Sequence, residues 1–307
     1  MLFRYYTMQL NPPFLFLVLF TSLITFSQVK VGQWSDHLSY NSANSVTKVG
    51  NTVYVSNYSG LAKYEVPTGV IEKYTKIEGL SDVGVQMLRK NDYNNVLLVI
   101  YKNTNIDVIK PDGGLINVSE IKRKVIQGKK YINDVDGKDI LAYISCGFGI
   151  VVFDTDKLEI KDTYYIANGI TNLEVYQATR NDNAFFAGTS SGVYYGNKNS
   201  NLSNFQNWKS LNVGLTAGPY NCVVNFDGKI LANFSQYIKT GATNQDIIYQ
   251  YDGTSWTAYP YRANSTNTAI YAYPQYNKIL IRDLGWIIDF SNTGVSTVSL
   301  NNYGFNY

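Results

Sequence analysis

Short apolar runs separated by tight turns recur along most of the chain. The clearest copy of this pattern is residues 172–211, with four runs at 173–179, 184–188, 193–195 and 208–211. Apolar and polar residues alternate within the first run, and Ser190, Ser191 and Gly192 form a turn signal between the second and third. Short alternating runs bounded by such turns are typical of β-strands. We therefore expect four antiparallel strands in this stretch.

The turn between the second and third strands gives the length of the repeat. A residue that tolerates positive φ is expected where the chain reverses direction, so this residue can be located in each copy. Gly60, Asn105, Gly149 and Gly192 occupy this place in four successive copies, with spacings of 45, 44 and 43 residues. A propeller blade takes roughly 40 to 50 residues. The sequence therefore predicts an all-β protein with the fold of a β-propeller.

Six four-stranded units can be recognised in this way. They span residues 44–75, 83–118, 131–166, 172–211, 220–259 and 269–300. The unbroken apolar run at residues 96–100 is typical of a strand buried on both faces, as between stacked sheets. Connections such as Gly79-Leu80 and Gly214-Leu215 are expected to bend at the glycine and to insert the leucine between neighbouring sheets.

Residues 34–38 resemble the outer strand that ends a unit, so we expect them to complete one more blade, the closure that protects the terminal edges of a propeller. The other three strands of that blade are not recognised. We therefore expect a seven-bladed ring whose last blade is incomplete in this chain, with the natural protein continuing beyond Tyr307, or else an irregular closure.

The first 27 residues have the pattern of a secretory signal peptide. They carry one cation, Arg4, and no acid, followed by the apolar run 14–26 and small residues that include Ser27. An apolar run of 13 residues is too short to cross a bilayer, which takes about 20. We expect residues 1–27 to be removed on export, leaving residues 28–307 as a propeller domain that is the N-terminal part of a longer protein.

The charge of the chain argues against nucleic-acid binding. Without Arg4, 25 Lys and Arg residues face 23 Asp and Glu residues, a balance of +2, whereas nucleic-acid binders concentrate basic residues on one face. The main basic cluster is Lys122-Arg123-Lys124 with Lys129 and Lys130. It is expected to be a solvated loop between blades, and the alternative is a site for anionic groups such as lipid A or phosphate.

The two cysteines are not expected to pair. Cys146 falls in the third unit and Cys222 in the innermost strand of the fifth. A disulfide requires a Cα separation of about 4.4 to 6.8 Å, and residues in these two blades should lie further apart. The sequence predicts two free, buried thiols.

No catalytic, metal-binding or cofactor-binding motif stands out. His37 is the single histidine, so a Ser/His/Asp triad would depend on it. No Gly-x-Ser-x-Gly nucleophile elbow is present, because the stretch Gly188 to Gly192, which matches these letters, lies in an expected β-hairpin and not at a turn from a strand into a helix. A lone histidine without a cysteine at ligand spacing does not make a zinc site. We expect a protein that is not an enzyme. A propeller glycosidase or lyase remains an alternative, because a pair of carboxylates could come from different blades.

Aromatic residues are expected at one end of the channel, where hairpins and connections between blades emerge together. That end would carry Tyr40, Tyr58, Phe148, Tyr220 and Trp286, with His37 nearby. Exposed aromatic side chains suit stacking on sugars or contact with a protein. The alternative for each of them is packing between blades.

Parts of the sequence resemble two known families. The hairpin Gly188-Thr189-Ser190-Ser191-Gly192, together with the connection Gly79-Leu80-Ser81, resembles the two-component-regulator propeller repeat. The opening Val31-Gly32-Gln33-Trp34-Ser35-Asp36-His37-Leu38-Ser39-Tyr40-Asn41 is similar to the start of the PorZ family of the type IX secretion attachment complex.

The PorZ resemblance implies a non-catalytic protein at the cell surface or in the periplasm. Members of that family bind anionic lipopolysaccharide and work beside a PorU-like sortase with PorV-like and PorQ-like outer-membrane proteins. No binding residue can be transferred from the family to this sequence. The propeller repeat alone keeps an alternative open, the periplasmic ligand-sensing propeller of a hybrid two-component system.

Overall fold

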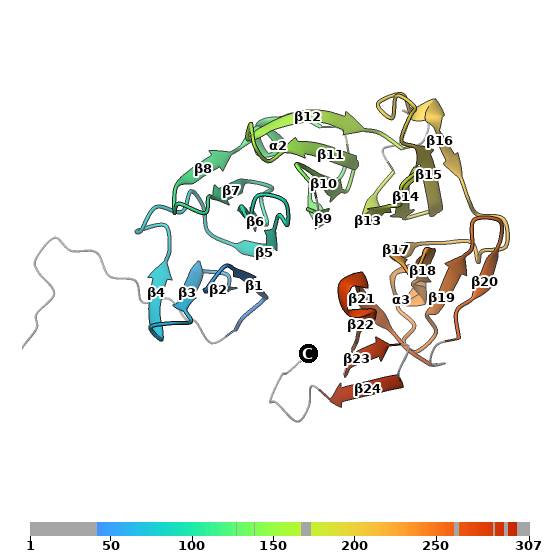
Figure 1. Cartoon of the computed structure of the whole chain (residues 1–307). Coiled ribbons are helices and arrows are strands. Elements are labelled where there is room, and N and C mark those ends of the chain that lie inside the picture. The colour runs from blue at the N-terminus through green and yellow to red at the C-terminus, as the bar shows by residue number, and fades with distance from the viewer. Residues whose placement is uncertain are drawn as a thin grey trace, which may run out of the picture. The chain divides into compact units, whose positions relative to one another are not determined.

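The computed structural model describes residues 42–126, 128–137, 139–166, 173–260, 264–284, 286–291 and 294–299 of the chain. These residues form six antiparallel sheets of four strands each, and every strand pairs only with its neighbours in sequence. The sheets stand as blades around a common centre, with the first strand of each blade innermost (Figure 1). The predicted all-β propeller with six four-stranded blades is thus confirmed.

The first three blades contain β1 to β12. Their bounds are β1 Ser45–Val49, β2 Thr52–Ser56, β3 Leu61–Glu65, β4 Val70–Tyr74, β5 Val85–Lys90, β6 Leu97–Tyr101, β7 Ile106–Ile109, β8 Leu115–Val118, β9 Ile132–Asp136, β10 Leu141–Cys146, β11 Gly149–Asp154 and β12 Glu159–Tyr164. A short helix, α2 (Glu120–Arg123), lies in the connection from the second blade to the third. All residues of β6 are buried, as the apolar run at 96–100 predicted.

The last three blades contain β13 to β24. Their bounds are β13 Val175–Arg180, β14 Ala184–Thr189, β15 Gly192–Asn197, β16 Trp208–Ser210, β17 Tyr220–Phe226, β18 Lys229–Phe234, β19 Ile247–Tyr251, β20 Trp256–Ala258, β21 Asn267–Tyr273, β22 Lys278–Asp283, β23 Trp286–Ser291 and β24 Gly294–Ser299. The 3-10 turns η1 (Phe205–Asn207) and η2 (Pro274–Tyr276) and the helix α3 (Gln236–Thr240) lie between strands. The sequence pattern did not predict α3, which lies between β18 and β19 of the fifth blade.

Apolar side chains fill the spaces between successive blades. Leu61, Leu80 and Leu97 belong to the cluster between the first and second blades, and four further clusters join the second blade to the third, the third to the fourth, the fourth to the fifth and the fifth to the sixth. Leu80 is 2% exposed and Gly79 has φ +123°. The expected role of the Gly-Leu connection is therefore confirmed at this position.

The inner strands of neighbouring blades are joined by side-chain amides at the channel. In the inner strands of the second to sixth blades one residue is skipped in the pairing, a β-bulge. Bulged residues and Asn44 supply the amides that donate to a carbonyl of the next inner strand. We call these four contacts the amide latches: Asn44 Nδ2 to Val85 O (2.7 Å), Gln86 Nε2 to Ile132 O (2.7 Å), Asn133 Nδ2 to Val175 O (2.8 Å) and Asn221 Nδ2 to Asn267 O (2.8 Å).

The four turn positions used as a measure do lie at equivalent corners, immediately before or at the start of the third strand of their blades. Positive φ is found at Gly149 (+140°) and Gly192 (+128°). It is not found at Gly60 or Asn105, and in the second blade Thr104 adopts it instead, with φ +66°. Gly60 is required for another reason, since a Cβ there would lie 2.8 Å from Tyr74 O.

The cysteines lie where the blade assignment placed them. Cys146 ends β10 in the third blade and Cys222 lies in β17, the inner strand of the fifth. Both thiols are buried and unpaired. Burial raises the pKa of both, that of Cys222 to about 12. The expected closure by residues 34–38 falls outside the described residues.

Gly149 offers a test of the turn geometry. A Cβ at this position would lie 2.3 Å from Tyr164 O, and the backbone has φ +140°. We expect Gly149→Ala to lower the free energy of unfolding by about 3 kcal/mol or more, measured by urea denaturation. Gly69→Ala is the control, since Gly69 has φ +70° with nothing within 4 Å of a Cβ. That change should cost only about 1 to 2 kcal/mol. Equal losses would contradict the close approach at Gly149.

Candidate functional site

The hairpins between second and third strands and the connections between blades meet at one end of the propeller, which we call the hairpin end. Gly84 N, in the connection from the first blade to the second, donates to Tyr58 O at 2.7 Å. Lys102 N, in the hairpin of the second blade, donates to Gly84 O at 2.9 Å. The expected grouping of loops is therefore present here, and these loops can present side chains together.

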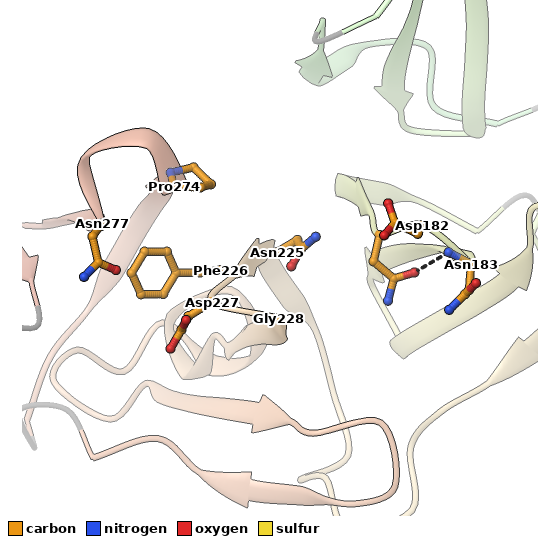
Figure 2. A pocket seen from close by; sticks show the side chains of 9 residues that line it. Asp182, Asn183, Asn225, Phe226, Asp227, Gly228, Pro274 and Asn277 are labelled. Atoms are coloured by element: carbon orange, nitrogen blue, oxygen red, sulfur yellow. Dashed lines mark hydrogen bonds between the residues drawn. The ribbon is translucent and has the colours of Figure 1, made fainter.

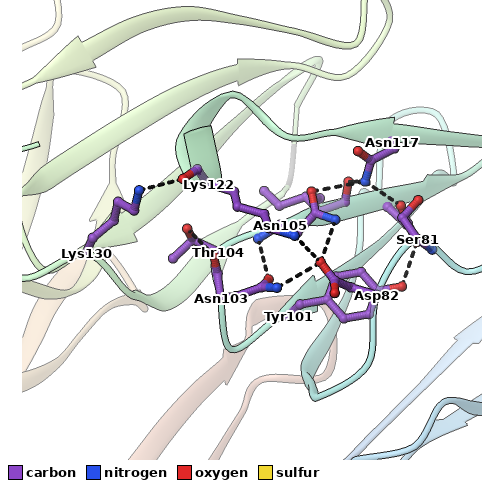
Figure 3. A network of polar contacts seen from close by, with 11 residues as sticks. Ser81, Asp82, Tyr101, Asn103, Thr104, Asn105, Asn117, Lys122 and Lys130 are labelled. Atoms are coloured by element: carbon purple, nitrogen blue, oxygen red, sulfur yellow. Dashed lines mark hydrogen bonds and ion pairs between the residues drawn. The ribbon is translucent and has the colours of Figure 1, made fainter. Parts of the chain in front are cut away.

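The carboxylate of Asp82, in the connection from the first blade to the second, accepts hydrogen bonds from three side chains. Asp82 Oδ2 accepts from Asn103 Nδ2 at 2.8 Å, from Asn105 Nδ2 at 3.1 Å and from Lys122 Nζ at 2.5 Å. The two asparagines belong to the hairpin of the second blade, and Lys122 belongs to α2 (Figure 3). Asp82 therefore ties a hairpin, a connection and the basic cluster into one polar network.

A second carboxylate, that of Asp107, fixes the backbone next to Asp82. Asp107 is fully buried in β7 and accepts from Tyr101 Oη at 2.6 Å, Ser81 N at 2.8 Å and Asn117 Nδ2 at 2.8 Å. Burial and the neighbouring Asp107 carboxylate raise the pKa of Tyr101 far above its usual range. Because Asp107 binds the backbone of Ser81, it fixes the position of the next residue, Asp82.

Electrostatics favour the charged form of Asp82. Burial by itself would raise the pKa of this carboxyl, but the hydrogen bonds from Lys122, Asn103 and Asn105 and the charge of Lys122 outweigh burial, so the pKa lies below its usual value. Hydrogen bonds to the ionised form and a nearby cation both act in this direction. Asp82 is thus an anion that holds Lys122 in place.

The basic loop, defined as residues 122–125 with Lys129 and Lys130, contains both anchored and unpaired cations. Lys130 Nζ donates to the carbonyl oxygens of Lys122 (2.6 Å) and Lys124 (3.0 Å), and therefore closes the loop on itself. Lys129 lies 3.5 Å from a Glu174 carboxylate oxygen. Arg123 and Lys124 are exposed, and neither has an ion pair within the described residues. Val125 beside them is 96% exposed.

Tyr58 adds an aromatic ring to the same end of the molecule. Its side chain is 59% exposed, and Lys102 Nζ lies 5.2 Å from the centre of the ring. A Gly84 Cβ would contact the ring at 3.3 Å, so the glycine allows the tyrosine to lie against the connection. An exposed ring with an ammonium group above it can contact a ligand that carries both apolar and anionic parts.

The other predicted aromatic residues do not all share this environment. Phe148 (1% exposed) and Tyr220 (0%) are buried between blades, so the expectation that they are exposed at the channel mouth is wrong. Phe148 packs in the cluster between the second and third blades, and Tyr220 Oη donates to Thr216 O at 2.9 Å. Trp286 begins β23, after the hairpin of the sixth blade. His37 and Tyr40 lie outside the described residues.

Two hollows are present elsewhere in the described residues. The central channel has a volume of about 820 Å³ and is lined by all six inner strands. A second cleft of about 490 Å³ lies among the hairpins that join the first and second strands of the fourth to sixth blades (Figure 2). Its lining includes Asp182 and Asp227 with four asparagines and no lysine or arginine. An anionic ligand therefore suits the hairpin end better than this cleft.

Within the part of the chain that the structure describes, no group of three or more His, Cys, Asp or Glu side chains could hold a metal ion. In the same residues no helix is long and apolar enough to span a bilayer. Asp82 and Asp107 were missed by sequence reasoning. The only available signal was the Asn103-Thr104-Asn105 turn, whose asparagines bind Asp82.

The fold and the hairpin end define a β-propeller whose hairpins and connections between blades meet at one end. The profile of the family described as the N-terminal β-propeller domain of PorZ, of the type IX secretion system, matches residues 53–209, just over half of the chain. The chain therefore belongs to the PorZ N-terminal β-propeller family. No curated protein matches it.

Solved structures share the fold at low sequence identity. PorZ of Porphyromonas gingivalis, described as an essential bacterial surface component of the type IX secretion system, aligns with a TM-score of 0.71 at 18% identity and covers 85% of this chain and 33% of its own. The extracellular domain of a putative hybrid two-component system of B. thetaiotaomicron aligns with a TM-score of 0.55 at 14% identity, covering 86% and 34%. The tricorn protease aligns with a TM-score of 0.58 at 12% identity, covering 85% and 31%. This chain spans about a third of the length of each.

The Asp82 network predicts a pH-dependent stability. Because the folded state lowers the pKa of Asp82, its contribution is complete above the unfolded value of about 3.9 and is lost as the pH falls through the folded value. We expect Asp82→Asn to be less stable than the natural protein near neutral pH, and the difference to shrink below about pH 3.9. Urea denaturation of both proteins across this range measures it. A difference that stays constant down to the lowest pH would contradict the assignment.

Proposed function

We propose that the chain is a non-catalytic, exported propeller of the type IX secretion attachment complex that acts at the cell surface or periplasmic face of the outer membrane. The observation that carries this proposal is membership of the PorZ propeller family over residues 53–209. The signal-peptide pattern of residues 1–27 supports export. In this role the protein is a scaffold and binding component beside a PorU-like sortase, with PorV-like and PorQ-like outer-membrane proteins as partners.

We further propose that the hairpin end contacts anionic lipopolysaccharide. The support is local chemistry: Arg123 and Lys124 are exposed cations, Val125 is an exposed apolar side chain next to them, and Tyr58 with Lys102 presents a ring and an ammonium group. Lipopolysaccharide combines phosphate or acidic sugar groups with acyl chains, so a surface with both cations and apolar side chains matches it. Lys122 and Lys130 have a different task, because their ammonium groups are used to hold the loop.

Removing the two unpaired cations tests the lipopolysaccharide contact. A basic residue near an anionic lipid surface contributes about 1 kcal/mol, so Arg123→Gln with Lys124→Gln should weaken binding by about 30-fold. Surface plasmon resonance on immobilised anionic lipopolysaccharide measures the change, and binding should weaken further as salt is raised. The matched control is Lys157→Gln with Lys229→Gln, which removes the same charge from turns at the opposite end. Equal binding by both double variants would refute this contact.

A separate experiment tests whether this protein is part of the secretion complex, without relying on lipopolysaccharide binding. We expect the affinity-tagged protein, isolated after cross-linking in its own cells, to carry the PorU-like sortase with it. The Arg123→Gln, Lys124→Gln variant should still recover the sortase if only the lipid contact is lost. Recovery of a histidine kinase instead of secretion components would show that the propeller serves as a sensor.

A further inference from the structure

The residue that the strand pairing skips at each inner-strand bulge has a different use in the fourth blade. In the second to sixth blades the skipped residues are Gln86, Asn133, Tyr176, Asn221 and Thr268. Three of them are amide latches, and the Thr268 hydroxyl binds Arg282 O (3.0 Å) and Arg282 Nε (2.7 Å). The Tyr176 hydroxyl makes no hydrogen bond with a described residue. The Tyr176 side chain therefore joins no blades by a latch.

Tyr176 lies where the central channel opens at the hairpin end. It is the second residue of β13, is half-buried and lines the channel. Ser190 N, in the hairpin of the fourth blade, donates to Glu174 O at 3.0 Å. Gly147 N, in the hairpin of the third blade, donates to Tyr131 O at 3.0 Å. The residues next to Tyr176 are thus held against the hairpins.

Glu174 connects Tyr176 with the basic loop. The Glu174 side chain is 11% exposed, and one of its carboxylate oxygens lies 3.5 Å from Lys129 Nζ. Burial and the Glu174 carboxylate raise the pKa of Tyr176 to about 12. The same two causes raise the pKa of Tyr131 far above its usual range. Both hydroxyl groups therefore stay protonated at neutral pH and can donate hydrogen bonds.

We propose that Tyr176, Tyr131 and Glu174 form a subsite for a sugar ring of the lipopolysaccharide that the basic loop contacts. A tyrosine ring packs against the apolar face of a sugar, and a carboxylate accepts hydrogen bonds from sugar hydroxyl groups. Arg123 and Lys124 contact the anionic groups, and the glycan continues from them to the channel mouth. This inference rests on the proposed lipopolysaccharide contact and adds to it a site for the uncharged part of the ligand.

The equivalent positions of the neighbouring blades supply the variant that tests the subsite. Each latch donates to the carbonyl group of the residue before the next skipped residue, and for the fourth blade that carbonyl is Tyr220 O. Tyr176→Asn gives the fourth blade the residue that the third and fifth blades have at this place, Asn133 and Asn221. We expect this variant to fold, because an asparagine here can form a latch. Urea denaturation and circular dichroism verify it.

Binding of the polysaccharide that mild acid releases from anionic lipopolysaccharide, without lipid A, measures the sugar contact. Tyr176→Asn should bind about 30-fold more weakly than the natural protein, because a ring contact and a hydrogen bond are both lost. Tyr176→Phe keeps the ring and should bind within about 5-fold of it. Tyr273→Asn, which removes a channel-lining tyrosine at the opposite end, is the matched control and should bind normally.

Salt separates this contact from the cations of the basic loop. The loss in Tyr176→Asn should be the same at low and high salt, because ring packing is not screened. The loss in Arg123→Gln with Lys124→Gln should shrink as salt is raised. A loss in Tyr176→Asn that shrinks in the same way would overturn the assignment of Tyr176 to the sugar.

The outcomes distinguish this subsite from the lipopolysaccharide contact itself. Equal binding by Tyr176→Asn and the natural protein would overturn the subsite and leave the contact of Arg123 and Lys124 intact. Binding of whole lipopolysaccharide without binding of the released polysaccharide would do the same. If the natural protein bound neither, both proposals would fail.

Nitration of the natural protein gives a second measurement that does not depend on a variant. Tetranitromethane modifies accessible tyrosines, and mass spectrometry locates the product. The released polysaccharide should slow nitration of Tyr176 in proportion to the fraction of protein that is bound. It should not slow nitration of Tyr276, which is 68% exposed at the opposite end. An unchanged rate at Tyr176 would overturn the subsite.

Discussion

Contact between the flat faces of neighbouring blades is the constraint on which the rest of this structure depends. A four-stranded sheet cannot bury its own faces, so each blade is stable only when adjacent blades cover it. Apolar clusters supply most of that contact. At the channel, where the blades converge, a β-bulge leaves backbone groups without ladder partners. The amide latches bind carbonyl oxygens at these points, and so the bulges hold successive blades together.

The same constraint positions the hairpin end. Leu80 is inserted between the first and second blades, which fixes the connection that carries it. Asp107, buried in the second blade, then binds the backbone of Ser81 and leaves Asp82 facing the hairpin. The orientation of Lys122 follows from Asp82. Packing in the interior therefore determines which cations of the basic loop are anchored and which are presented to solvent.

The blades could be predicted from sequence because each carries its own turn signals at a regular spacing. Gly149 and Gly192 satisfy backbone requirements that only glycine meets easily, so they recur at the same corner. Phe148 could not be placed, because a residue next to a tight turn can face solvent or the adjacent blade, and the choice depends on residues of that other blade. The amide latches were equally invisible: Asn133 and Asn221 act through bulges, and a bulge leaves no mark in the pattern of apolar residues.

Charged side chains in the channel serve the same purpose as the latches, and this limits where recognition can occur. Arg89 donates to Asp134 at 2.7 and 3.2 Å, and the other carboxylate oxygen of Asp134 accepts from Gln177 at 3.0 Å. Gln177 in turn accepts from Val223 N at 2.8 Å, so one continuous chain of contacts runs from the second blade to the fifth. Arg89 and Asp134 are partly buried, with side chains 25% and 15% exposed, and a ligand that displaced one of them would have to replace its bonds. At the hairpin end, Arg123 and Lys124 are exposed and have no ion pair within the described residues, so a contact with them would break no bond of this kind.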